Sequence, residues 1–96
     1  MTIDGQRTDP AESLAALRDD IERVDARLVA LIAERVRLAR AVGDAKRALG
    51  RPTIDPAREA AVVRHAGELA RDAGLDEGEV REVFWRLIAL SRRAQG

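Results

Sequence analysis

The stretch LAALRDDIERVDARLVALIAERVRLARAVGDAKRAL, residues 14–49, decides the fold, because apolar side chains recur along it at alternating spacings of three and four. That spacing places them on one stripe of a long α-helix, as in helices that pack against other helices. The helix is predicted to start at Pro10 and to end before Gly50 and Pro52, which favour a stop. The stripe comprises Leu14, Leu17, Ile21, Val24, Leu28, Leu31, Leu38, Val42, Ala45 and Leu49.

Two shorter helices are predicted after the long one. The first starts at Pro56 and stops at Gly74, and the second follows a capping residue at Asp76 and continues nearly to the C-terminus. The predicted fold class is therefore all-α, with one long and two shorter helices. We expect a single domain over residues 9–96, preceded by a flexible tail at residues 1–8.

The composition favours helix and excludes several functions. Alanine contributes 18 residues and leucine 10, whereas two residues are aromatic. Lys and Arg number 17 and Asp and Glu number 17, so the net charge is zero. Nucleic acid is not an expected partner, because its phosphates require a net basic face. With no cysteine and one histidine, no metal site is expected.

The longest uninterrupted apolar run is far shorter than the length that a membrane-spanning helix requires. The polar N-terminal residues also lack the apolar core of a signal peptide. We therefore expect no membrane association and a cytoplasmic location.

The length of the first helix raises a packing problem. About 40 residues at ~1.5 Å per residue give a helix of ~60 Å, whereas a compact domain of ~100 residues has a radius of gyration of ~13 Å. One copy of the two shorter helices cannot cover that stripe, and an uncovered stripe would expose a large apolar patch. We therefore predict an interlocked helical-bundle homodimer, in which the long helix of a second chain packs antiparallel to the first.

Several polar residues occupy positions where the long helix should present apolar groups. Arg35 takes a position of the stripe itself, and Arg18 and Lys46 flank the same stripe. A cation inside a bundle is costly unless it is paired. Each residue also has a structural interpretation: Arg35 could set the register or pair with Glu59, and the other two could be solvated.

The shorter helices contribute further polar groups. Glu59 lies on the apolar side of the second helix with Arg58 beside it, and the stripe of the third helix continues into Ser91 and Gln95. Fraying at the C-terminus would be enough to explain the last two. Together, however, these groups and the cations of the long helix predict a pocket with excess positive charge, whose natural ligand is a small polyanion. Arg92, which follows Ser91 in the sequence, is interpreted together with Arg93 as a solvated helix end.

These positions resemble the all-helical chorismate mutase family. The chain carries an L-R-x-x-I-x-x-x-D motif from Leu17 and an A-E-R segment from Ala33. It also carries a G-x-A-K segment from Gly43 and a D-x-x-R-E segment from Asp55. The resemblance covers nearly the whole chain, and several spaced polar motifs in one register make it specific.

The resemblance implies a pocket that binds chorismate, a dicarboxylate, and rearranges it to prephenate on the route to phenylalanine and tyrosine. The implied substrate-binding residues are Arg18, Arg35, Lys46, Asp55, Arg58, Glu59, Ser91 and Gln95. The implied catalytic residues among them are Lys46, Gln95, Arg35 and Arg18. Because the rearrangement is intramolecular and concerted, the resemblance implies no cofactor, no metal ion and no general base.

The implied catalytic residues come from two chains. Arg18 of the partner subunit and Arg35 would each bind a carboxylate, while Lys46 and Gln95 would donate hydrogen bonds to the ether oxygen. Arg18 precedes Lys46 by 28 residues in one helix, a separation of ~42 Å that one small ligand cannot bridge. Lys46 is also the only lysine among 17 basic residues, and a compact point charge suits a single oxygen better than a guanidinium does.

The remaining implied residues bear on specificity. Ser91 and Arg58 would support the carboxylate contacts, and Glu59 and the backbone around Asp55 would hold the ring hydroxyl. The alternatives on the same fold are an isochorismate pyruvate-lyase and an aminodeoxychorismate mutase, although a carboxylate at Glu59 favours chorismate. A non-enzymatic helical interaction module is the alternative of another class. A shikimate-pathway synthase, which activates some small members of the family, is a further candidate partner.

Overall fold

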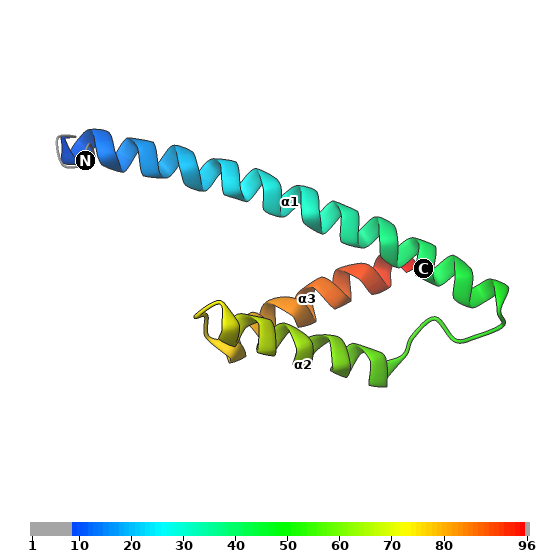
Figure 1. Cartoon of the computed structure of the whole chain (residues 1–96). Helices are drawn as coiled ribbons and strands as arrows, with labels where there is room; N and C mark the ends of the chain where they lie inside the picture. Colours follow the sequence, from blue (N-terminus) through cyan, green and yellow to red (C-terminus); the bar gives the residue numbers. More distant parts are fainter. Residues whose placement is uncertain (1–8, 96) are drawn as a thin grey trace. The chain divides into compact units, whose positions relative to one another are not determined.

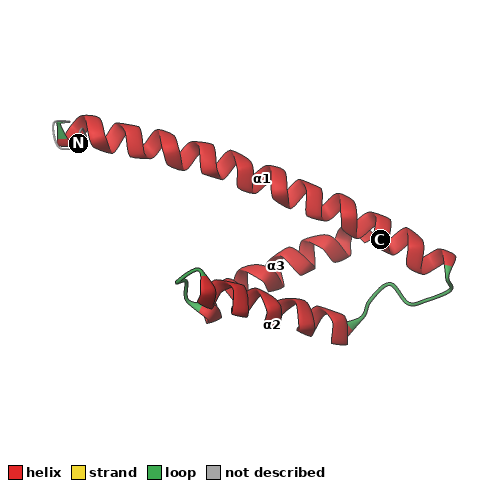
Figure 2. Cartoon of the chain, in the orientation of Figure 1, coloured by secondary structure: helices red, strands yellow, loops and turns green. Residues whose placement is uncertain are grey.

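The computed structural model describes residues 9–95, which fold into three α-helices with no strand among them (Figure 1, Figure 2). The helices are α1, Pro10–Ala48, α2, Pro56–Asp72, and α3, Glu77–Gln95. The predicted all-α class with one long and two shorter helices is confirmed, and the long helix ends one residue earlier than predicted. The predicted tail at residues 1–8 lies outside the described residues.

The chain divides into two compact units whose boundary falls within α1. The N-terminal unit ends at Ile32, and the C-terminal unit begins at Ala33 and contains the rest of α1 together with α2 and α3.

The residues that begin and end the helices act as the sequence indicates. The Asp55 side chain accepts a hydrogen bond from the Arg58 amide at 3.1 Å and so caps α2. Asp76 does the same for α3 through the amide of Glu79 at 2.8 Å. Gly74 follows α2 with φ of +75°, a left-handed conformation that glycine adopts without steric cost.

The core of the C-terminal unit lies between α2 and α3, which run antiparallel side by side (Figure 1). The buried apolar side chains of this core are Val63, Ala66 and Ala70 of α2 and Ile88 of α3. Because most of these side chains are small, the two helix backbones can approach closely. The core is accordingly thin and leaves room beside it for a polar pocket.

The N-terminal unit is one helical segment whose predicted apolar stripe is exposed in the single chain. The exposed fractions run from 43% at Val24 to 60% at Leu31. The exposed members of the stripe in this unit are Leu14, Leu17, Ile21, Val24, Leu28 and Leu31. An apolar row of this kind indicates a surface that another element should cover. Among the described helices, none combines the length and the apolar character that a membrane crossing requires.

The turn that joins α2 and α3 into a helical hairpin provides a test of the backbone conformation assigned to Gly74. A methyl group added at Gly74 would meet no atom within 4 Å, so the cost of Gly74→Ala arises from its positive φ alone. We expect this change to lower the free energy of unfolding by about 1–2 kcal/mol. Gly74→Asn should lose less, because asparagine tolerates the left-handed region better. Urea unfolding at fixed protein concentration measures both, and an unchanged Gly74→Ala protein would contradict the assigned conformation.

Candidate functional site

The C-terminal unit contains a pocket of about 300 Å³, at the lower end of the size range of small-molecule sites. Residues of α1 after the unit boundary, the segment between α1 and α2, and both shorter helices contribute to its wall. Its lining comprises Arg35, Leu38, Ala39, Val42, Lys46, Thr53, Asp55, Arg58, Glu59, Val62, Ile88, Arg92 and Gln95.

The polar lining carries an excess of positive charge. Four of the lining residues are cationic and two are carboxylates, so the pocket has two more positive than negative charges. The cations are Arg35, Lys46, Arg58 and Arg92, and the carboxylates are Asp55 and Glu59. Apolar side chains of α1, α2 and α3 complete the wall. A small anion with an apolar body fits such a lining.

Arg35 is held by a hydrogen-bonded chain that begins on α3. Its Nη1 donates to the Ser91 Oγ at 2.7 Å, and that hydroxyl donates to the Leu87 carbonyl at 2.9 Å. Ser91 is 6% exposed, so its hydroxyl is fixed within the hairpin. The contact settles the open alternative for Arg35, whose partner is Ser91 and not Glu59. A guanidinium has five donors, so Arg35 can keep this bond and still bind a carboxylate.

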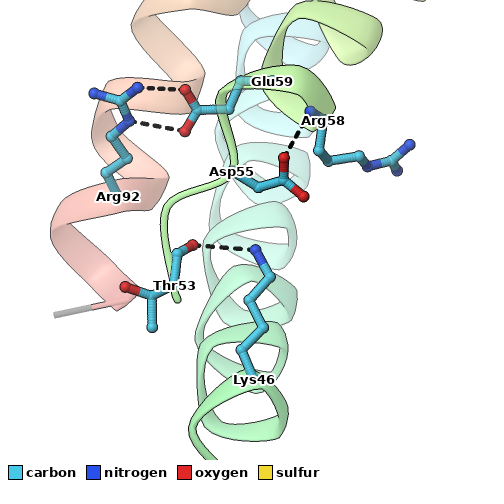
Figure 3. A network of polar contacts seen from close by, with 6 residues as sticks. All are labelled: Lys46, Thr53, Asp55, Arg58, Glu59 and Arg92. Atoms are coloured by element: carbon cyan, nitrogen blue, oxygen red, sulfur yellow. Dashed lines mark hydrogen bonds and ion pairs between the residues drawn. The ribbon is translucent and has the colours of Figure 1, made fainter. Parts of the chain in front are cut away.

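Lys46, which lines the pocket, contacts the segment that leads into α2 (Figure 3). The Nζ atom of Lys46 donates to the carbonyl of Thr53 at 3.1 Å. This bond ties the half-buried ammonium group to the loop that leads into α2. An ammonium group has three donors, so Lys46 can hold the loop and still donate to a ligand. The side chain of Asp55 caps α2, and Asp55 is also one of the residues that line the pocket.

Glu59 is paired with Arg92 across the hairpin (Figure 3). The Nε atom of Arg92 donates to Oε2 at 2.8 Å, and its Nη2 donates to Oε1. The hydrogen bond from Arg92 is the main reason that the pKa of Glu59 lies below its ordinary value, with the charge of Lys46 adding to the effect. Burial and the charge of Asp55 oppose this lowering. Glu59 is therefore an ionised acceptor at neutral pH.

This pair corrects the interpretation of Arg92 as a solvated helix end. Arg92 lines the pocket and its partner lies 33 positions earlier in the chain. The sequence does contain a weak signal for this contact, because Glu59 and Arg92 lie on neighbouring predicted helices and carry opposite charges. Helical periodicity alone does not set which arginine of the third helix faces that carboxylate.

Gln95 is brought to the pocket by close packing of α3 against α1. Gly43 is the buried residue of α1, and a Cβ atom built on it would lie 3.3 Å from the Gln95 Cβ. Arg47 donates from Nη1 to the carbonyl of Gln95 at 2.8 Å. The glycine thus permits the approach and the arginine holds the last turn of α3 near Lys46.

The structure brings most of the eight predicted residues together. Six of them line the pocket: Arg35, Lys46, Asp55, Arg58, Glu59 and Gln95. Ser91 lies directly behind Arg35 as its hydrogen-bond partner. Arg18 is exposed and belongs to the N-terminal unit. Within residues 9–95, no group of three or more potential ligand side chains is arranged to hold a metal ion.

The fold and the pocket define an all-helical protein with a compact site for a small anion. Comparison with known proteins identifies the class, because residues 17–96 match the family model described as chorismate mutase type II. The chain therefore belongs to the chorismate mutase type II family, as its sequence motifs predict.

Individual relatives agree with the family match. A chorismate mutase of Methanocaldococcus jannaschii is 34% identical over 84 residues, which cover 88% of this chain and 85% of that protein. An intracellular chorismate mutase of Mycobacterium tuberculosis is 31% identical over 72 residues, covering 75% of this chain and 69% of that protein. A bifunctional chorismate mutase/prephenate dehydratase of Enterobacter agglomerans is 39% identical over 79 residues. The match covers 82% of this chain but 20% of that longer protein.

The bond between Arg35 and Ser91 can be tested by stability measurements. Ser91→Ala removes the acceptor that the guanidinium uses, and we expect the free energy of unfolding to fall by about 1 kcal/mol. The value is at the low end for a charged hydrogen bond because Arg35 is half-buried and can turn to water. A double-mutant cycle with Arg35→Met, measured by urea unfolding, isolates the pair. A coupling energy of zero would contradict its contribution.

Proposed function

We propose that the pocket of the C-terminal unit binds chorismate and catalyses its rearrangement to prephenate. The observation that carries the proposal is the meeting of Arg35, Lys46 and Glu59 in one small cavity. Arg35 can bind a carboxylate, Lys46 can donate a hydrogen bond to a single oxygen, and the ionised Glu59 can accept one from a hydroxyl. The substrate carries a group that matches each of these three roles. Two carboxylates, an ether oxygen and a ring hydroxyl are the polar groups of chorismate.

The first task of the site is to hold the substrate in a reactive shape. Carbon–carbon bond formation and cleavage of the ether bond occur together in a chair-like conformer, in which the two ends of the substrate lie close. Arg35, fixed by Ser91, binds one carboxylate, and Arg58 supports it. Fixing the two ends converts a rare conformer into the bound one, which lowers the entropic part of the barrier.

The second task is to stabilise the charge that develops on the ether oxygen. Lys46 Nζ and the Gln95 amide line the same pocket and are both hydrogen-bond donors. Each residue is held in place by a hydrogen bond, Lys46 by the Thr53 carbonyl and Gln95 through its backbone carbonyl by Arg47. Donors that are already in place need little reorganisation when the charge appears, which makes them effective.

The third task is recognition of the ring hydroxyl. Glu59 is an ionised acceptor, and the backbone at Asp55 lies beside it in the pocket wall. An acceptor at this place distinguishes chorismate from isochorismate, whose hydroxyl lies elsewhere on the ring. Isochorismate and aminodeoxychorismate remain the alternative substrates on the same fold. A non-enzymatic helical module would have no need of this combination of groups.

The site is completed by a second copy of the chain, in an interlocked homodimer. The exposed stripe of the N-terminal unit needs an apolar partner. Two further hollows along α2 and α3 could receive this stripe of a second chain. The first hollow shares Arg35 and Arg58 with the site pocket, and the second has an entirely apolar lining. Phe84 and Leu69 belong to both hollows. A partner helix seated there carries Arg18 to the second carboxylate.

The sequence also predicts a candidate partner and a location in the cell. A shikimate-pathway synthase stays a candidate activating partner, and a cytoplasmic location stays a prediction from the sequence. The relative described as intracellular supports the location.

The activity itself is tested by incubating the purified protein with chorismate and following the loss of its ultraviolet absorbance. Lys46→Ala should lower kcat by at least about 10²- to 10³-fold, as expected for the loss of one preorganised donor. Its helical content by circular dichroism should be that of the parent. The matched control is Arg64→Ala, an exposed cation of α2 outside the pocket, which should keep the parent rate. A folded Lys46→Ala protein with near-parent turnover would contradict the assignment.

The shared site is tested by mixing two inactive variants. Arg18→Ala and Arg35→Ala homodimers should both be nearly inactive. After joint unfolding and refolding, a mixed dimer has one pocket with both changes and one with neither. About a quarter of all pockets should then be intact, as two-fold symmetry requires, and activity should return to roughly that fraction.

Mass spectrometry of the refolded sample verifies that mixed dimers have formed. If they are present and the sample is as inactive as the separate variants, the pocket does not combine Arg18 and Arg35 from different chains. Each variant refolded alone serves as the control for recovery.

A further inference from the structure

Arg92 lies in the pocket but is not one of the eight residues that the family resemblance implies. Its guanidinium engages both carboxylate oxygens of Glu59 from α3, the opposite helix of the hairpin. The Glu59 side chain is 14% exposed, whereas that of Arg92 is 46% exposed. A more exposed guanidinium is therefore paired with a largely buried carboxylate (Figure 3).

We infer that Arg92 is a positioning residue, which holds Glu59 in place to accept the ring hydroxyl and keeps it from pairing with Lys46. The inference rests on the proposed function, because it concerns how Glu59 performs the task assigned to it there. A carboxylate has about four lone-pair sites. The two-point contact with Arg92 uses one on each oxygen and leaves acceptor capacity for the substrate.

The need for such a residue follows from the charges around Glu59. Lys46 and Arg35 line the same pocket from α1 and Arg58 from α2, and Asp55 lines it where α2 begins. A flexible anion among these cations would be attracted to the nearest one. If Glu59 paired with Lys46, the ammonium group would be drawn from its place near the ether oxygen. Arg92 satisfies the carboxylate at the rim and leaves Lys46 to its contact with Thr53.

The ionisation of Glu59 offers a direct readout of this pair. Arg92 is the largest influence that lowers the Glu59 pKa, while burial and Asp55 raise it and Lys46 lowers it. Removing Arg92 takes away the largest influence that lowers the pKa of Glu59, and a contact with Lys46 would compensate for it in part, so the pKa of Glu59 should rise. The acid limb of the kcat/KM profile should then move to higher pH, because Glu59 is protonated earlier as pH falls.

The experiment compares Arg92→Met, Arg92→Lys and Arg93→Met with the parent in the full-length protein. We expect Arg92→Met to lower kcat/KM about tenfold, with KM raised because the hydroxyl contact exists in the bound substrate and kcat lowered because Lys46 is drawn from the ether oxygen. Arg92→Lys should recover part of the loss and part of the shift in the acid limb. Arg93→Met, an exposed neighbour outside the pocket, should resemble the parent. The pH titration of the Glu59 carboxyl carbon by NMR follows the pair without reference to turnover.

A second set of variants, made in the Glu59→Gln protein, distinguishes an effect of Arg92 through Glu59 from a direct effect of Arg92 on the substrate. In Glu59→Gln protein, Arg92→Met should cause little further loss of kcat/KM and no further movement of the acid limb. If the two losses multiply, or if Arg92→Met alone leaves both kcat/KM and the Glu59 titration unchanged, the inference about Arg92 is wrong. If Glu59→Gln itself turns over chorismate at the parent rate, the assignment of Glu59 fails, and the role of Arg92 fails with it. The chorismate mutase activity of the parent remains a separate result.

Discussion

The concentration of fixed positive charge in one small pocket is the constraint on which the rest of the structure depends. Four cations line the cavity, and the chain supplies two carboxylates against them. Like charges in one small cavity repel, and three of the four cations are held by a specific partner. Arg35 is held by Ser91, Lys46 by Thr53, and Arg92 by Glu59. The net excess that remains is what a dicarboxylate can neutralise.

This arrangement suits a reaction that transfers no proton. A concerted rearrangement requires shape and electrostatic stabilisation, and both depend on donors that stay in place while the bonds change. The contacts that fix the donors come from the segments next to α2 and α3. Thr53 lies in the loop before α2, and Arg47 holds the Gln95 carbonyl near the end of α1. The rigidity of the site therefore depends on the contacts that join α1 to the loop before α2 and to the end of α3.

The sequence predicts the helices and most of the pocket for identifiable reasons. Helix limits depend on local residues such as Asp55 and Gly74, whose capping chemistry acts within a few positions of the chain. The helical period is enough to place Glu59 on an interior face. It cannot predict the partner of Arg92, because that contact joins positions 33 residues apart and depends on the packing of α2 on α3. The same limit applies to the carbonyl of Thr53, which lies in a loop without periodicity.

We propose that Arg35 and Lys46 of one chain, together with Arg18 of the partner subunit, enclose the dicarboxylate. A crystal structure of the protein with bound prephenate tests this proposal most directly. We expect one product carboxylate on Arg35, the other on Arg18 of the partner subunit, and Lys46 within hydrogen-bond distance of the oxygen released from the ether. Prephenate bound elsewhere on the protein, or in this pocket without contact to Lys46 or to a second chain, would contradict it.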